Sequence, residues 1–201
     1  MRRRNPLLVP GTRNIHYWQY FVALEADLAA TARYVEPTSA NMACYSVEFA
    51  RILLTAGSEV DVLCKVLCQE HQLPVSPVNI NGYRAAITKR FPGFTKLEIL
   101  APRYGLVRLP WQQWDQNSNP NWWRSYNDVK HERHGHFASA NLRNALDAMA
   151  GLFVLVSYLC KEELRARTAL PWPQMLTLDP SLSSYIRTNA RPGHVLPDFA
   201  P

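Results

Sequence analysis

The chain has 201 residues, of which 47% are hydrophobic, which is enough apolar material for one domain with a sizeable core. Its longest apolar run, residues 148–160, is 13 residues long and falls short of the roughly 18 that a membrane span requires. The basic N-terminus has only a three-residue apolar run before Pro10, too short for a secretion signal, so we expect a cytoplasmic protein without membrane contact.

The net charge of +6 is concentrated in two basic segments. Residues 1–13 carry four arginines and no acid, and residues 84–108 carry six bases and a single acid, Glu98. Two such segments can form a surface for a polyanion such as nucleic acid, or they can simply be solvated. Charge alone does not choose between these interpretations.

Helical periodicity covers the first part of the chain. Apolar side chains recur at steps of three and four between residues 15 and 36, and Pro37 ends this pattern. A longer pattern, about residues 39–71, predicts a second helix that continues through Gly57. On that helix we expect Glu48 to be exposed, whereas Glu59 is placed where it can reach inward toward a basic partner.

The cysteines lie inside apolar segments of these helical patterns. Their spacing lacks the paired C-x-x-C arrangement of a structural zinc site. We therefore interpret all four as reduced thiols in the core: Cys44, Cys64, Cys68 and Cys160.

The middle of the chain has weaker signals. Residues 80–91 predict a short helix with Tyr83, Ile87 and Phe91 on one side, ended by the pair Pro92-Gly93. Residues 95–111 alternate weakly around the turn-like sequence PRYG, which favours a small β-hairpin or an extended loop.

From residue 121 the helical pattern returns for about a dozen residues, and Gly135 is expected to break or cap it. A long apolar helix follows at about 138–167. The proline-rich remainder is a tail that either lies over the bundle or is partly disordered.

These patterns predict an all-α fold, a four- or five-helix bundle with a small β-hairpin or loop insertion near residues 95–111. We expect a basic N-terminal arm at 1–14, a helical domain at 15–167 and a proline-rich C-terminal tail at 168–201.

The segment NPNWWRSYNDVKHERHGHF, residues 119–137, concentrates unusual chemistry. Arg124 and His131 are seven residues apart, so they project from one helix face two turns apart, and Asn127 lies on the same stripe. Histidine can move the proton that metal-free RNA cleavage requires, and arginine can stabilise the phosphate in the transition state. The alternative is structural: Arg124 pairs with Asp128, and His131 is merely solvated.

The sequence WWRSYNDVKHER, followed by a long apolar helix, resembles the HEPN superfamily of small α-helical bundles, whose signature is an arginine and a histidine with four to six residues between them; here six residues separate Arg124 from His131. The acidic GSEVD at 57–61 is also similar to the second helix of such bundles. Many of these proteins are metal-independent endoribonucleases in toxin–antitoxin and phage-defence systems, active as dimers with two motifs in one cleft. The resemblance implies that Arg124 stabilises the phosphate, His131 is the general acid/base and Asn127 is the polar residue within the motif.

Several expectations follow from this interpretation. The protein forms a homodimer, needs no cofactor or metal, and has RNA and an antitoxin or other protein as candidate partners. We expect the RNA backbone to be guided by Arg84, Lys89, Arg90, Lys130 and Arg133. The competing interpretation is a non-catalytic HEPN-like module that binds RNA or a partner protein through the same face.

Two further features of this region have alternative interpretations. The histidines at 131, 134 and 136 together with Asp128 suggest a metal site, but a break at Gly135 favours a solvated cationic helix end. Clustered tryptophans can stack on bases but more often pack the end of a bundle. Packing is what we expect of Trp111, Trp114, Trp122 and Trp123.

Overall fold

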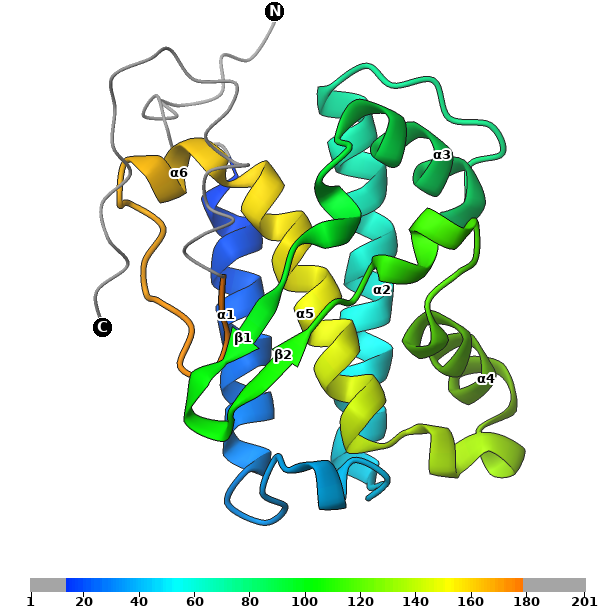
Figure 1. Cartoon of the computed structure of the whole chain (residues 1–201), viewed down its shortest axis with the longest axis vertical. Helices are drawn as coiled ribbons and strands as arrows, with labels where there is room; N and C mark the ends of the chain where they lie inside the picture. Colours follow the sequence, from blue (N-terminus) through cyan, green and yellow to red (C-terminus); the bar gives the residue numbers. More distant parts are fainter. Residues whose placement is uncertain (1–13, 179–201) are drawn as a thin grey trace, which may run out of the picture.

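The computed structural model describes residues 14–178 and shows a helical bundle with a small antiparallel sheet (Figure 1). The predicted all-α bundle with an insertion near 95–111 is confirmed. The helices are α1 (Ile15–Thr31), α2 (Val47–Glu70), α3 (Ile80–Arg90), α4 (Asn121–His136), α5 (Leu142–Leu159) and the short α6 (Lys161–Arg165). The strands are β1 (Ile99–Ala101), β2 (Leu106–Arg108) and β3 (Thr177–Leu178). Nearly all of the expected N-terminal arm and most of the expected tail lie outside the described residues.

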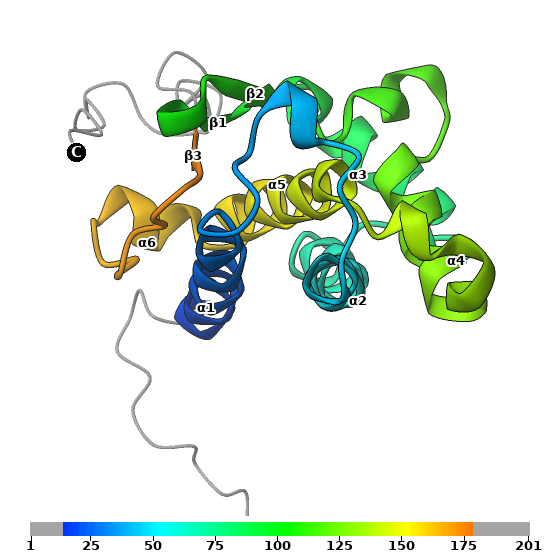
Figure 2. The ribbon, with the colours of Figure 1, turned by 90° about the horizontal axis from the view of Figure 1, so that it is seen from below.

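Helix α5 is the centre of the bundle and has almost no solvent-facing side. Of its 18 residues only Arg143 is exposed. Figures 1 and 2 show α5 beside α1 and α2, with the β1–β2 hairpin on its other side. By length and composition α5 is the one described helix that could cross a membrane. However, 83% of it is buried inside the protein, which is typical of a core helix. The large apolar residues at helical spacing along it are all buried: Leu142, Leu146, Met149, Phe153, Val156 and Leu159.

The start of α2 differs from the prediction. The helix begins at Val47, where the Ser46 hydroxyl accepts a hydrogen bond from the backbone N–H of Phe49 at 3.1 Å and so caps it. Residues 39–41 form only a 3₁₀ turn. Backbone hydrogen bonds join residues 44–46 to residues 140–142 instead, which keeps this segment out of the helix.

The altered start of α2 also changes the environment of one thiol. Cys44 lies before the helix and is exposed, so its assignment to the core is wrong. Cys64, Cys68 and Cys160 are buried as expected, and burial raises the pKa of Cys68 to about 11 and that of Cys160 to about 12. These buried thiols therefore stay protonated and act as small apolar core groups.

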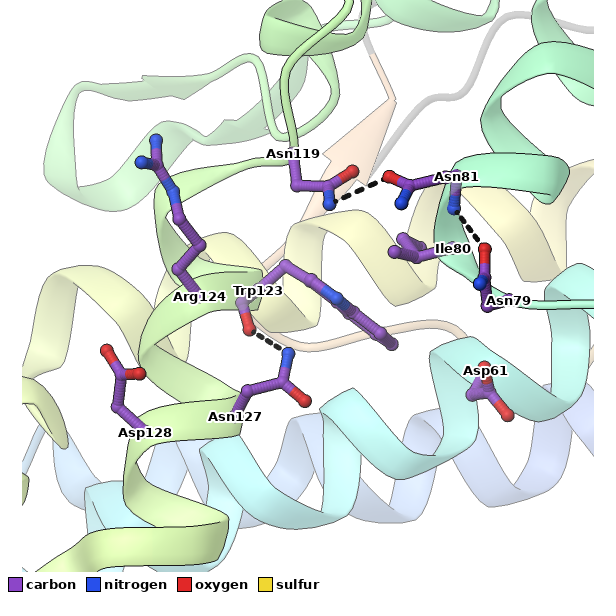
Figure 3. Close-up of a pocket in the computed structure, with 9 residues that line it drawn as sticks. All are labelled: Asp61, Asn79, Ile80, Asn81, Asn119, Trp123, Arg124, Asn127 and Asp128. Atoms are coloured by element: carbon purple, nitrogen blue, oxygen red, sulfur yellow. Dashed lines mark hydrogen bonds between the residues drawn. The ribbon is translucent and has the colours of Figure 1, made fainter. Parts of the chain in front are cut away.

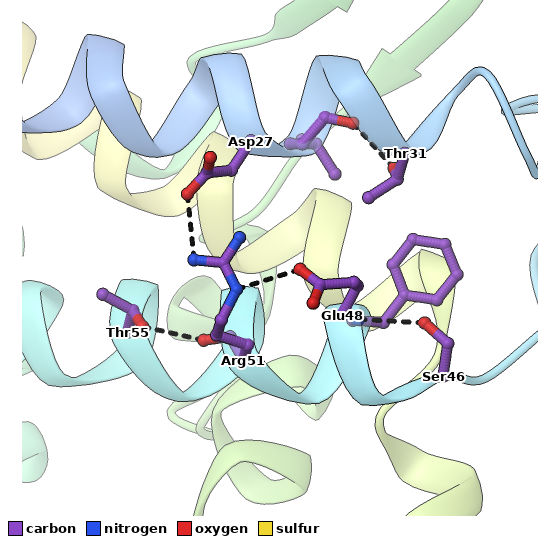
Figure 4. A network of polar contacts seen from close by, with 8 residues as sticks. Asp27, Thr31, Ser46, Glu48, Arg51 and Thr55 are labelled. Atoms are coloured by element: carbon purple, nitrogen blue, oxygen red, sulfur yellow. Dashed lines mark hydrogen bonds and ion pairs between the residues drawn. The ribbon is translucent and has the colours of Figure 1, made fainter.

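A polar cluster joins α1 to α2 at the surface (Figure 4). Arg51 of α2 donates hydrogen bonds to Asp27 of α1 and to Glu48, both at 2.9 Å, and these bonds raise the pKa of Arg51. Glu48 is exposed, as the sequence indicated. Because the Arg51 side chain is 46% exposed, such ion pairs contribute at most about 1 kcal/mol, and the two helices are held together mainly by apolar packing.

Of the two alternatives for residues 95–111, the structure shows the β-hairpin, and a third strand joins it. Strand β1 pairs with β2 on one side and with β3 on the other, so the order is β2-β1-β3. Gly105 in the turn has a φ of 63°, a left-handed conformation that glycine adopts without strain. The pairing with β3 brings residues 168–178 over the bundle, which agrees with the draping alternative for this part of the tail.

A buried carboxylate on α1 holds this C-terminal segment. Glu25 is 0% exposed and accepts hydrogen bonds from the backbone N–H groups of Gln174, at 2.9 Å, of Met175, and of Leu176, at 3.0 Å. The three N–H groups satisfy the charge in the core, as a buried carboxylate requires. Glu25 therefore links the first helix to a segment about 150 residues later.

The late helical pattern is divided into two helices. The predicted helix at 138–167 consists of α5 and α6, and a 3₁₀ turn at Phe137–Ser139 precedes them. Asn141 caps α5 by accepting a hydrogen bond from the backbone N–H of Asn144 at 3.1 Å, which sets its start. The chain changes direction at Cys160 before α6.

Substitution of Glu25 tests its role as an anchor. Glu25→Gln keeps the size of the side chain but replaces one acceptor oxygen with a donor that faces backbone N–H groups. We expect the free energy of unfolding in urea to fall by on the order of 2 kcal/mol. The control is Glu36→Gln, at an exposed position, with an expected change within about 0.5 kcal/mol. Equal effects of the two substitutions would contradict the anchor.

Candidate functional site

Helix α4 carries the predicted catalytic stripe and has two distinct faces. Its buried face consists of Trp122, Trp123, Tyr126 and Val129. Arg124 and His131 are exposed on the other side, and Asn127 is half-buried at the boundary. The stripe therefore lies at the surface, as a reactive site requires.

The tryptophans fix the N-terminal end of α4. The Trp122 indole donates to the carbonyl of Pro110 at 2.9 Å, and the Trp111 indole donates to the carbonyl of Gly151 in α5 at 3.1 Å. The Trp111 and Trp122 rings meet edge to face with centroids 5.2 Å apart. The packing interpretation is confirmed because Trp111, Trp114, Trp122 and Trp123 are all buried.

Helix α4 also packs closely on α2. A Cβ atom at Gly57 would lie 2.4 Å from Cδ2 of Tyr126, so the ring occupies the space that the glycine leaves open. Beside this contact, Asn144 of α5 donates to the hydroxyl of Ser125, the neighbour of Tyr126, at 3.0 Å. Neighbours on α2 and α5 thus hold α4 in place beneath the stripe.

The break in α4 is at Glu132, not at Gly135 as predicted. Glu132 has φ −136° and ψ 48°, so His131 ends the regular part of the helix and His134 and His136 follow the break. All three histidines are exposed, in agreement with a solvated cationic helix end. Within residues 14–178 no group of three His, Cys, Asp or Glu side chains is placed to hold a metal ion.

A pocket of about 490 Å³ lies between α2, the start of α3 and α4 (Figure 3). Two of the three stripe residues, Arg124 and Asn127, contribute to it, whereas His131 does not. Most of its wall comes from segments far apart in the sequence, which no local pattern brings together. The lining residues are Asp61, Asn79, Ile80, Asn81, Asn119, Trp123, Arg124, Asn127 and Asp128.

The Arg124 guanidinium is not paired with Asp128. It donates to the side-chain oxygen of Asn121 at 2.7 Å, and Figure 3 shows it pointing away from Asp128. The structural alternative of an Arg124–Asp128 pair is therefore wrong. The guanidinium remains charged and exposed, but it is directed toward the start of α4, while His131 lies about 10 Å further along the helix axis.

Asn127 is oriented by the backbone of its own helix. Its side-chain N–H donates to the carbonyl of Trp123 at 2.8 Å. This bond leaves the amide oxygen of Asn127 as an acceptor at the pocket (Figure 3). Asn127 therefore offers its acceptor oxygen to the pocket and does not orient His131.

Two of the predicted RNA-contacting bases lie close to the stripe. Lys130 and Arg133 are exposed on α4, on either side of His131 and Glu132. The Lys130 ammonium lies 5.4 Å from the centroid of the Tyr126 ring, a cation–π contact that leaves the charge at the surface. These two residues keep their predicted proximity to His131.

The bases on α3 are divided between two places. Arg84 is half-buried and donates to the side-chain oxygen of Asn119 at 2.9 Å, so it supports the pocket wall. Lys89 and Arg90 are exposed at the far end of α3, about 15 Å along the axis from its first residue. Arg90 lies against Phe91 there, and burial, with the charge of Arg90 as a smaller cause, lowers the pKa of His71. The five predicted bases thus do not form a single patch.

The two acids of the GSEVD segment have different positions. Asp61 is exposed and lines the pocket. Glu59 is half-buried, and within residues 14–178 it has no ion pair, so the expected basic partner is not found. Burial raises the pKa of the Glu59 carboxyl because the charged form loses solvation.

The close packing of α4 on α2 is testable at Gly57. Gly57→Ala places a methyl group against the Tyr126 ring, and we expect overpacking of about 1–3 kcal/mol to exceed the roughly 1 kcal/mol that alanine adds in helix propensity. The control is Gly135→Ala, where no atom lies within 4 Å of the added Cβ. Urea unfolding should show a loss only for Gly57→Ala; an equally stable Gly57→Ala would contradict the contact.

The raised pKa of Glu59 predicts that replacing its carboxyl group increases the stability of the protein, by an amount that depends on pH. A carboxyl whose folded-state pKa exceeds its unfolded value destabilises the protein once the pH rises through the folded value. Glu59→Gln should therefore increase stability at pH 7 by on the order of 0.5 kcal/mol, and the gain should vanish near about pH 3.5. Thermal unfolding at both pH values measures this difference. A gain that is the same at both would show that ionisation of Glu59 is not its cause.

Comparisons with protein-family models, with curated proteins and with solved structures find no match to this chain.

Proposed function

We propose that the protein is a metal-independent endoribonuclease of the HEPN type that acts in the cytoplasm as a toxin or phage-defence effector. The observation that supports this most is the exposure of Arg124 and His131 on one face of α4, where no carboxylate of residues 14–178 pairs with the guanidinium. Arg124 would bind the scissile phosphate, and His131 would transfer the proton.

The proposed reaction uses the 2′-hydroxyl of the RNA as nucleophile. His131 takes the proton from this hydroxyl, the 2′ oxygen attacks the adjacent phosphorus, and the bond from phosphorus to the 5′ oxygen breaks. The leaving 5′ oxygen receives a proton, and the products are a 2′,3′-cyclic phosphate and a 5′-hydroxyl end. Arg124 offsets the negative charge that gathers on the phosphate in the transition state.

The positions of the two residues make a homodimer part of this proposal. Along α4 they are about 10 Å apart, and the guanidinium is turned toward Asn121. One phosphate can contact both groups if the Arg124 side chain leaves Asn121 or if a second copy supplies one of them. A paired arrangement would also let one His131 accept the proton and the other donate one. A further protein, such as an antitoxin, would act by covering this face.

A second candidate is a non-catalytic module that binds RNA or a partner protein through the same face. The hydrogen bond between Arg124 and Asn121 favours it, because it directs the guanidinium away from His131. Phosphate binding by Arg124, Lys130 and Arg133 requires no histidine chemistry.

RNA cleavage in excess chelator separates these candidates. The wild type should produce fragments that end in a 2′,3′-cyclic phosphate from a mixed tRNA and mRNA-like substrate set. Arg124→Ala and His131→Ala should each lower the rate by about 100-fold or more, the usual effect of losing such a group. Their folding is checked by urea unfolding.

His134→Ala is the matched control, because His134 is an exposed histidine beyond the break in α4. It should cleave at the wild-type rate. Cleavage that survives His131→Ala would remove His131 from the mechanism. Folded wild-type protein that binds the RNA but leaves it intact would favour the non-catalytic module.

A further inference from the structure

The pocket beside Arg124 has the chemistry of a base-binding site more than that of a phosphate site. Two carboxylates, Asp61 and Asp128, line it, while Arg124 is the one cation among its lining residues. An anion inside this pocket would meet the two carboxylates, whereas a neutral, flat group with both donors and acceptors would not. Its volume of about 490 Å³ lies within the usual range of small-molecule sites, about 300–1,000 Å³.

The direction of the hydrogen bonds on the α3 side is fixed by Arg84. A guanidinium can only donate, so the oxygen of Asn119 must face Arg84, at 2.9 Å, and its amide nitrogen must face Asn81, at 3.1 Å. The oxygen of Asn81 is therefore occupied, and its amide nitrogen remains as a donor for the pocket (Figure 3). The oxygen of Asn79 is also occupied, because it caps α3 by accepting from the backbone N–H groups of Asn81 and Gly82. Its amide nitrogen therefore remains as a second donor.

Acceptors occupy the opposite side of the pocket. Asp61 of α2 is exposed and, within residues 14–178, has no ion pair or hydrogen bond that occupies its carboxylate. The amide oxygen of Asn127 is also left as an acceptor, since its nitrogen is bound to the Trp123 carbonyl. The Trp123 indole lies between these two sides and supplies an aromatic wall (Figure 3).

We propose that this pocket binds an unstacked guanine base of the RNA and so sets the sequence preference of the protein. Guanine alone among the four RNA bases places two adjacent donors, N1–H and the 2-amino group, next to an acceptor, O6, on one edge. The donors suit the Asp61 carboxylate, O6 suits the amide nitrogens of Asn79 and Asn81, and the phosphate of the same nucleotide lies at the rim beside Arg124. This inference deepens the proposed function and rests on it for the role of RNA.

Binding of single nucleotides tests the pocket without any cleavage. Guanosine, adenosine, cytidine and uridine 5′-monophosphates are titrated in chelator by isothermal calorimetry against the full chain. The guanosine nucleotide should bind at least about 10-fold more tightly than the uridine nucleotide, the usual discrimination of a good bidentate contact. Asp61→Asn should remove this preference, because an amide offers one acceptor in place of two.

Two controls make the result specific. Glu48→Gln changes an exposed acid on the same helix, outside the pocket, and should bind like the wild type. Arg124→Ala should weaken the binding of all four nucleotides by a similar factor, because each loses the same phosphate contact, and so should keep the guanine preference. Asp61 is exposed, so its substitution should not disturb folding, as circular dichroism would verify.

The outcomes distinguish this inference from the nuclease proposal. A guanine preference that Asp61→Asn removes supports the inference even if no RNA is cleaved, and in that case only the nuclease proposal fails. Equal binding of all four nucleotides, or a preference that Asp61→Asn leaves intact, overturns the inference even if RNA is cleaved. Binding of N-acetylarginine amide in place of guanosine monophosphate overturns it in favour of a cationic ligand.

Discussion

A helix without a solvent-facing side must be covered on every side, and this requirement of α5 organises the rest of the bundle. Helices α1 and α2 cover one side of it, and the hairpin covers the other. The small residue Gly151 lets the Trp122 ring approach within 2.9 Å of where a Cβ would stand. The aromatic cluster therefore seats the start of α4 directly on the central helix. Removal of any of these layers would expose apolar surface of α5 to water.

The candidate site is a consequence of this arrangement. Helix α2 packs most extensively on α5, and α3 and α4 both pack on α2, so segments far apart in the sequence meet at one surface. Asp61, Asn81 and Asn127 come from three different helices and border the same pocket. The apolar packing of the three helices thus sets the distances between these polar groups.

Local signals in the sequence account for much of the fold. The helix at 80–91 and the turn at PRYG were predictable because Asn79 caps the former and Gly105 supplies the left-handed residue of the latter. Long-range pairing explains the wrong start of α2 and the wrong placement of Cys44. The start of α2 depends on backbone bonds between residues 44–46 and 140–142, and no local pattern reveals them.

Among the polar residues, too, local patterns predict only those that lie on one element. The stripe on α4 could be derived from helical spacing, because its members share one helix. The pocket could not, since the local sequence indicates Asn79 only as the cap of α3 and the lining residues converge only in the folded chain. Glu25 left a usable signal, an acid between Leu24 and Leu28 on the apolar face of α1, although its partners in residues 174–176 could not be named from that signal.

The two faces of α4 have different surroundings: one packs on the bundle and the other faces solvent. Trp122 and Tyr126 fix the position of the helix, whereas Arg124, Asp128 and His131 lie outside that packing. Substitutions on the exposed face therefore leave the bundle intact, and those on the buried face change it. Selection for a new ligand and selection for stability act on interleaved but separate positions, so a lineage can alter what this helix recognises without rebuilding the protein that carries it.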